Sequence, residues 1–128
     1  MSKPSVIQTE NAPQAIGPYS QAVRSGSFLF CSGQIPLDPV TQELVGGSIE
    51  EQTHRVMKNL QGVLAAAGSG FGGVLKTTVY LKNMGDFPSF NRVYESYLKP
   101  PYPARATVEV AALPKGALVE IELVACTD

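Results

Sequence analysis

Hydrophobic and polar positions repeat with two different periods along the chain, and these periods divide it into eight elements. Alternation of apolar and polar residues predicts strands, whereas spacings of three and four residues predict helices. Strands are expected at residues 6–9, 21–24, 27–35, 74–81, 105–112 and 118–126, and helices at 48–67 and 86–98. The predicted order is βββαβαββ, an α/β (α+β) arrangement with one mixed sheet and two helices packed on one of its faces.

The first predicted helix, residues 48–67, has the clearest pattern. Ser48 followed by Glu51 is a capping box, and Gly68 is placed to end the helix in a left-handed cap. Its apolar stripe lies at helical spacing: Thr53, Val56, Met57, Leu60, Val63, Leu64 and Ala67. The opposite face is polar and carries His54, the only histidine, which is therefore predicted to be a solvated surface residue.

The second predicted helix, residues 86–98, has a stripe of aromatic residues. Asp86 is the predicted cap, and the buried stripe consists of Phe87, Phe90, Tyr94 and Tyr97. Pro100, Pro101 and Pro103 follow and force the chain into an extended conformation before the next strand.

The predicted strands leave more half-apolar surface than two helices can cover. Two helices cover one face of a sheet of this size, so the other face has to find a different partner. That face is expected to carry charged, polar and aromatic side chains together: Arg105, Glu120, Ser32, Gln34, Phe28 and Phe30. This mixture predicts a subunit interface that contains a small polar pocket.

Composition allows either a surface that is poor in charge or one that is hidden against other chains, and it excludes several classes of function. The 128 residues fit one domain, 1–128, and only 16% are charged, against ~25% in average soluble domains. The net charge is −1 and Lys and Arg are scattered singly, which argues against a dedicated nucleic-acid binder. No apolar run reaches the ~20 residues of a membrane span, and residues 1–11 are polar and do not resemble a signal peptide. The expected location is cytoplasmic.

Metal and nucleotide sites are not indicated by the motifs. Cys31 and Cys126 have no short spacing and the chain has one histidine, so no metal site is expected and the two thiols are predicted to be reduced. Residues 68–73 match G-x-G-x-x-G, but they follow a helix and open a strand, the reverse of a dinucleotide-binding context. This segment is interpreted as a connector, and no cofactor is expected.

Arg105 and Glu120 are the candidate functional residues. Prolines fix the approach to Arg105, and a rigid guanidinium fork matches a carboxylate. A cross-strand ion pair with Glu120 or Glu122 explains Arg105 equally well. Glu120 lies among apolar residues, where desolvation suits a general acid or base, or else it pairs with Arg105 or Lys115. The residues alone thus indicate a carboxylate-binding pocket with a possible acid or base.

Several collinear motifs resemble those of the Rid family (the YjgF/YER057c type). The opening blocks are Ala12-Pro13, Ile16-Gly17-Pro18-Tyr19-Ser20-Gln21-Ala22 and Ser32-Gly33-Gln34-Ile35-Pro36. The middle blocks are Gln52-Thr53, Asn59-Leu60, Val74-Leu75-Lys76-Thr77-Thr78-Val79 and Phe90-Asn91-Arg92-Val93-Tyr94. The closing blocks are Pro103-Ala104-Arg105, Val108-Glu109-Val110-Ala111-Ala112-Leu113-Pro114 and Leu118-Val119-Glu120-Ile121-Glu122.

The resemblance implies a chorismate-mutase-like fold, a homotrimer with sites between subunits, and an activity that needs no cofactor. Members of the RidA branch hydrolyse 2-iminobutanoate and 2-iminopropanoate to 2-oxo acids and ammonia, which protects pyridoxal-phosphate enzymes. By resemblance, Arg105 holds the substrate carboxylate and Glu120 positions the attacking water. The matching pocket positions are Tyr19, Ser32, Gly33, Asn91 and Thr107. Many members have a cysteine where this chain has Thr107, which puts any thiol-based regulation in doubt.

Two other functions remain open at this point. Some members of the family are described as endoribonucleases that inhibit translation, although this chain has neither a basic stripe nor a pair of histidines. The same cleft also suits a non-enzymatic trimeric module that binds small molecules or acts like a chaperone.

Overall fold

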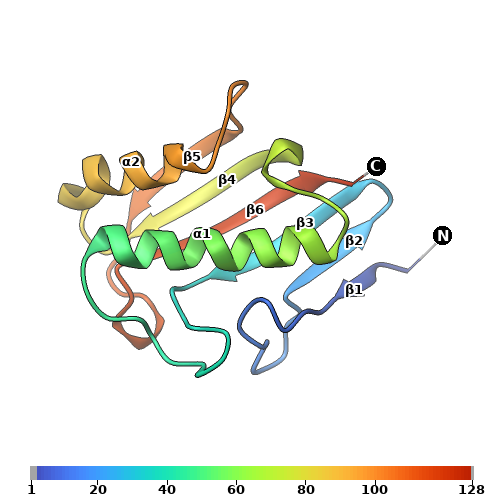
Figure 1. Cartoon of the computed structure of the whole chain (residues 1–128), viewed down its shortest axis with the longest axis horizontal. Helices are drawn as coiled ribbons and strands as arrows, with labels where there is room; N and C mark the ends of the chain where they lie inside the picture. The colour runs from blue at the N-terminus through green and yellow to red at the C-terminus, as the bar shows by residue number, and fades with distance from the viewer. Residues whose placement is uncertain (1–2, 128) are drawn as a thin grey trace.

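The computed structural model describes residues 3–127 and contains one six-stranded sheet and two α-helices (Figure 1). The strands are β1 (Ser5–Ile7), β2 (Ala22–Ser25), β3 (Phe28–Gln34), β4 (Val74–Leu81), β5 (Ala104–Glu109) and β6 (Val119–Cys126). The helices are α1 (Ile49–Ala66) and α2 (Phe87–Ser96). This confirms the predicted order and the α+β class.

The strands follow the spatial order β1-β2-β3-β6-β4-β5. The pairs are antiparallel except for β4 with β5, which run parallel and are connected through α2. The last strand, β6, therefore lies in the middle of the sheet, between β3 and β4. Figure 1 shows both helices on the same face, with α1 crossing the centre of the sheet and α2 lying over the β4–β5 end.

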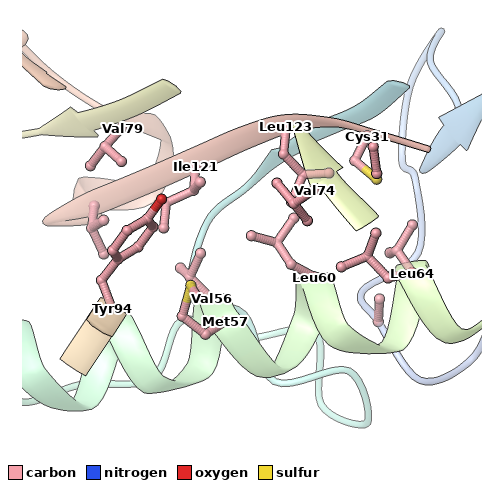
Figure 2. Close-up of a cluster of buried hydrophobic side chains, with 14 of the residues drawn as sticks. Cys31, Val56, Met57, Leu60, Leu64, Val74, Val79, Tyr94, Ile121 and Leu123 are labelled. Carbon is pink, nitrogen blue, oxygen red and sulfur yellow. The ribbon is translucent and has the colours of Figure 1, made fainter. Parts of the chain in front are cut away.

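The core lies between this sheet face and α1. Ser48 caps the helix by accepting a hydrogen bond from the backbone N–H of Glu51, as predicted. Figure 2 shows Leu60 and Leu64 of α1 directed at the sheet residues Val74 and Leu123, and the whole predicted stripe from Thr53 to Ala67 is buried. His54 is exposed, as expected, and its Nδ1 lies 2.8 Å from the Tyr97 hydroxyl.

Cys31 and Cys126 are free thiols, as predicted. Cys31 lies in the core, where burial raises its thiol pKa to about 12, so the thiolate form is strongly disfavoured.

Two irregularities in strand pairing change which residues face the helices. The β3–β6 register shifts between Cys31 and Gln34, so Gln34 pairs with Ile121 and is buried under the helices. The prediction that Gln34 lies on the uncovered face is therefore wrong. A similar shift in β4 turns Leu75 outward and places Val74 in the core. An extra residue in one strand turns the residues beyond it to the opposite side of the sheet. The alternation of apolar and polar residues does not reveal where such an extra residue lies.

The expected position of Arg105 on the uncovered face is also wrong. Arg105 pairs with Thr77, which is buried under the helices, and paired residues of neighbouring strands point to the same side. Glu120 pairs instead with Tyr80, on the opposite side of the sheet. The apolar Ala106 and Val108 alternate with Arg105 along β5 and pair with Thr78 and Tyr80, so they face outward on the uncovered side. Arg105 instead lies against the side of α2.

The uncovered face is partly apolar, as predicted. Phe28 and Phe30 are each 47% exposed on it, and Val108 is 44% exposed. The cross-strand partners of Phe30 are Val23 and Val124, which extend this apolar strip across three strands. None of the helices described is both long and apolar enough to cross a membrane.

Candidate functional site

Arg105 is held by the side chains of one helix. It lies in β5, the strand that follows the proline-rich segment, and its Cζ lies 5.2 Å from the centroid of the Phe87 ring and 5.1 Å from that of Tyr94. Its Nη1 donates a hydrogen bond of 2.6 Å to Oδ1 of Asn91. Residues 87, 91 and 94 share one face of α2 because they are spaced by four and three residues.

These residues border a hollow of about 350 Å³, lined by Asn91, Tyr94, Glu95, Tyr102, Pro103 and Arg105. A guanidinium that is oriented beside a hollow is suited to bind a carboxylate through two parallel hydrogen bonds. The alternative prediction, a cross-strand ion pair between Arg105 and Glu120 or Glu122, is wrong because these carboxylates lie on the other face of the sheet.

Thr107 lies on the same side as Arg105, opposite the buried Val79. Its Oγ1 is buried and has no hydrogen-bond partner among residues 3–127. A buried hydroxyl without a partner is uncommon in folded proteins. It is placed on the face of β5 that carries the candidate arginine.

Glu120 borders a second hollow, of about 460 Å³, on another part of the molecule. Its lining includes Tyr19, Gly33 and Lys115, together with apolar side chains such as Ile16 and Leu37. Burial raises the pKa of Glu120, and the neighbouring Glu122 carboxylate raises it further. Within the described part of the chain, neither Arg105 nor Lys115 forms an ion pair with it, so both of its predicted salt bridges are absent. A half-buried carboxylate of raised pKa is suited to accept a proton near neutral pH.

Gly33 approaches the Glu120 carboxyl group more closely than any other residue type allows. A Cβ atom placed on Gly33 lies 2.9 Å from Cδ of Glu120 and still closer to Oε2. The irregular pairing after Cys31 creates this approach. Tyr19, 53% exposed, lines the same hollow, whereas the Ser32 hydroxyl donates to the backbone carbonyl of Ser20.

The predicted site residues thus form two groups that one chain does not bring together. Arg105, Asn91 and Thr107 lie on the α2 side of the sheet, and Tyr19, Gly33 and Glu120 lie around the other hollow. The two hollows share no lining residue.

Two residues of the first group escaped the sequence prediction. Phe87 and Tyr94 were assigned only to the buried stripe of α2, yet their rings also contact Arg105. The available signal was the polar Asn91 within this aromatic stripe, since a polar residue on a core-facing helix stripe usually has a specific partner. Across residues 3–127, no cluster of three or more His, Cys, Asp or Glu is arranged to hold a metal ion.

Comparison with known proteins identifies the class. The family model described as endoribonuclease L-PSP matches residues 9–127, and the chain therefore belongs to this family, which is the Rid family that the motifs resemble. The 2-iminobutanoate/2-iminopropanoate deaminase of Homo sapiens is 49% identical over 120 residues, covering 94% of this chain and 88% of the human protein.

Other relatives are slightly more similar but are named differently. A RutC family protein of Pyrococcus horikoshii is 54% identical, covering 94% of this chain and 95% of its own. The crystal structure of a Rid family protein of unknown function from Yersinia pestis superposes with a TM-score of 0.95 at 50% identity, covering 98% of this chain and 100% of that one. These comparisons confirm the family and the fold.

Proposed function

We propose that this protein hydrolyses 2-imino acids such as 2-iminobutanoate and 2-iminopropanoate to 2-oxo acids and ammonia. The observation that carries the proposal is the Arg105 guanidinium, held by Asn91 beside an open hollow and suited to a small carboxylate. The second support is Glu120, whose raised pKa suits a general base. The mouse and human relatives named as deaminases for these two imines support the substrate class.

The proposed chemistry needs only binding, a base and water. Arg105 binds the substrate carboxylate and thereby fixes the position of the neighbouring carbon, which is double-bonded to the protonated imine nitrogen. Glu120 accepts a proton from a water molecule whose oxygen attacks that carbon and forms a tetrahedral carbinolamine. Glu120 returns this proton to the nitrogen, and the C–N bond then breaks as Glu120 accepts the proton of the carbinolamine hydroxyl, which leaves the 2-oxo acid and ammonia. Ammonia takes that proton from Glu120 and is released as ammonium, so one water molecule is consumed and the carboxylate is regenerated. Atoms and charge balance without a cofactor.

The proposed assembly is a homotrimer in which each site lies between two copies. Arg105 and Glu120 lie on opposite faces of the sheet in one chain, so they meet only if different subunits supply them. The uncovered face with Phe28 and Phe30 provides the apolar surface that such contacts require. In this arrangement Tyr19, Ser32 and the Gly33 backbone N–H line the Glu120 side of the cleft, and Asn91 and Thr107 line the Arg105 side.

The test is ammonia release in the presence of a threonine dehydratase that produces the imine from threonine. The protein is expected to accelerate ammonia release, and Arg105→Ala is expected to abolish the acceleration. Arg92→Ala is the matched control, because Arg92 is an exposed arginine of α2, the helix that holds Arg105, and its Nη2 donates a hydrogen bond to Oγ of Ser89.

Full acceleration by Arg105→Ala would contradict the proposal. Tight binding of a 2-oxo acid with no acceleration would favour the non-enzymatic binding module instead. RNA cleavage that survives further purification and disappears with Arg105→Ala would favour the endoribonuclease.

A further inference from the structure

The aromatic residues beside Arg105 have a role that the proposed reaction does not by itself require. We propose that Phe87 and Tyr94 are positioning residues that clamp the Arg105 guanidinium in its carboxylate-receiving orientation before the substrate arrives. The effect of the clamp on substrate binding rests on the proposed function, whereas the clamp itself is a property of the free protein.

The contacts of Arg105 limit its motion on several sides. Both ring centroids lie within 5.2 Å of its Cζ, inside the ~6 Å range of a cation–π interaction. Asn91 engages Nη1 through its Oδ1. Because an arginine has five N–H donors, this single bond leaves donors on Nε and Nη2 for a carboxylate. An otherwise exposed arginine of an edge strand is thus held in one place and still has donors to offer.

The Tyr94 ring is anchored in the core. Tyr94 is 5% exposed, and its hydroxyl lies 2.7 Å from Oγ1 of the buried Thr77. Its ring centroid lies 5.3 Å from that of the fully buried Phe90. Thr77 is also the β4 partner of Arg105, so the residue that anchors the Tyr94 ring lies beside the backbone of Arg105.

The Phe87 ring is anchored through the same core residue. It stacks on Phe90, with centroids 6.4 Å apart and planes inclined by 22°. Phe90 therefore supports both rings that contact Arg105. Preorganisation of this kind increases affinity, because less side-chain freedom is lost when the ligand binds.

The experiment compares three variants with a matched control. Tyr94→Leu and Phe87→Leu each remove one ring, and Tyr94→Phe keeps the ring but removes the bond to Thr77. Tyr97→Leu makes the same change three residues further on, where Tyr97 contacts His54 and Phe71. Two measurements are made: NMR detection of guanidinium rotation in Arg105 of the free protein, and calorimetric affinity for 2-oxobutanoate.

Restricted rotation of the Arg105 guanidinium is expected in the unaltered protein and in Tyr97→Leu, with faster rotation in both variants that lose a ring beside it. Affinity for 2-oxobutanoate is expected to fall about 3- to 30-fold in these two variants, the range of one cation–π contact. Tyr94→Phe is expected to lose less affinity for 2-oxobutanoate than Tyr94→Leu. In the imine assay, KM is expected to rise more than kcat falls, because the clamp acts on binding.

The outcomes separate the clamp from the deaminase. Unchanged rotation and unchanged affinity in folded Phe87→Leu and Tyr94→Leu overturn the clamp, even if the protein hydrolyses imines. If Tyr94→Leu does not fold, Phe87→Leu decides, because Phe87 is only partly buried at the start of α2. Faster rotation of the Arg105 guanidinium in a variant that lacks one ring supports the clamp. If the unaltered protein in that case hydrolyses no imine, only the proposed function is overturned.

Discussion

At the scale of single residues, Glu120 shows how surroundings prepare a common side chain for chemistry. Its pKa is raised above the ordinary 4.5, first by burial and then by the charge of Glu122. Glu122 in turn accepts a hydrogen bond of 2.6 Å from the hydroxyl of Tyr80. The proton affinity of Glu120 thus depends on a neighbour that has no assigned part in the reaction.

The raised pKa of Glu120 predicts the pH dependence of the reaction. A general base must be deprotonated, so the rate is expected to rise with pH through the raised pKa. Glu122→Gln removes one cause of the shift and keeps an oxygen for Tyr80, so the acidic limb of the pH–rate profile is expected to move to lower pH. Glu120→Gln is expected to remove the activity. An acidic limb unaffected by Glu122→Gln would contradict this role of Glu122.

The same shift has a consequence for stability. A carboxyl group whose pKa is raised by folding binds its proton more strongly in the folded state, so stability falls as pH rises through the interval above 4.5. Glu120→Gln carries no charge at any pH. The Tm of this variant minus the Tm of the unaltered protein is therefore expected to increase as the pH rises from about 4 to about 8. A constant Tm difference would show that the environment does not shift the pKa.

Gly33 gives a second prediction at this scale. The Cβ of Gly33→Ala would overlap the Glu120 carboxyl group, which is the free end of a flexible side chain and moves aside at low cost. We expect little change in Tm but a loss of about 10- to 100-fold in kcat, since small misplacements of a reacting group have effects of this size. Gly72→Ala is the control, because a Cβ there meets nothing within 4 Å. Unaltered kcat in Gly33→Ala would remove Glu120 from the mechanism.

At the scale of elements, the sequence predicted the helices and strands well, but it predicted poorly which side of the sheet each strand residue faces. The capping box at Ser48 and the stripe of α1 are strong local signals, and α1 begins and ends within a residue or two of its prediction. The facing of Gln34 and Leu75 depends on strand irregularities that residue types do not specify. The candidate site was misplaced for the same reason: the sequence singles out Arg105 and Glu120, but the face on which each lies depends on pairing partners that are distant in the sequence.

Gly62 shows how a contact between elements can oppose local preference. Alanine is favoured over glycine inside a helix by about 0.8–1.0 kcal/mol. A Cβ on Gly62, however, would lie 3.0 Å from the carbonyl carbon of Asn11 and closer to its oxygen. This backbone is fixed because Ala12 and Pro13 are buried and the Gln21 side chain donates to both of their carbonyls.

We therefore expect Gly62→Ala to lower the free energy of unfolding by up to about 2 kcal/mol, because overpacking of about 1–3 kcal/mol offsets or exceeds the gain in helix propensity. Urea denaturation measures the change. Ala65→Gly is the control, because it lies on the exposed side of α1 and tests helix propensity alone. Its free energy of unfolding is expected to fall by about 1 kcal/mol. A higher free energy of unfolding for Gly62→Ala would show that the backbone around Asn11 moves at little cost to make room for the new Cβ atom.

At the scale of the whole molecule, the proposed trimer gives the 16% charged share and the apolar strip around Phe30 one explanation, because the uncovered face would be the contact surface between copies of the chain. A trimer is expected to sediment at about three times the 13.6 kDa of one chain. In the proposed trimer, the placement of Arg105 and Glu120 on opposite faces would make the assembly part of the chemistry, because neither residue reaches the other within one copy.

This division predicts that two inactive variants restore activity together. Arg105→Ala and Glu120→Gln, denatured, mixed in equal amounts and refolded, form about three mixed trimers in every four, and each has one intact site of three. The mixture is expected to recover about a quarter of the unaltered activity in the ammonia assay. Arg105→Ala refolded with the double variant Arg105→Ala/Glu120→Gln has no intact site and serves as the control. Mass spectrometry of the intact assemblies verifies that mixed trimers have formed. If they have formed and remain inactive, Arg105 and Glu120 of neighbouring subunits do not share a site.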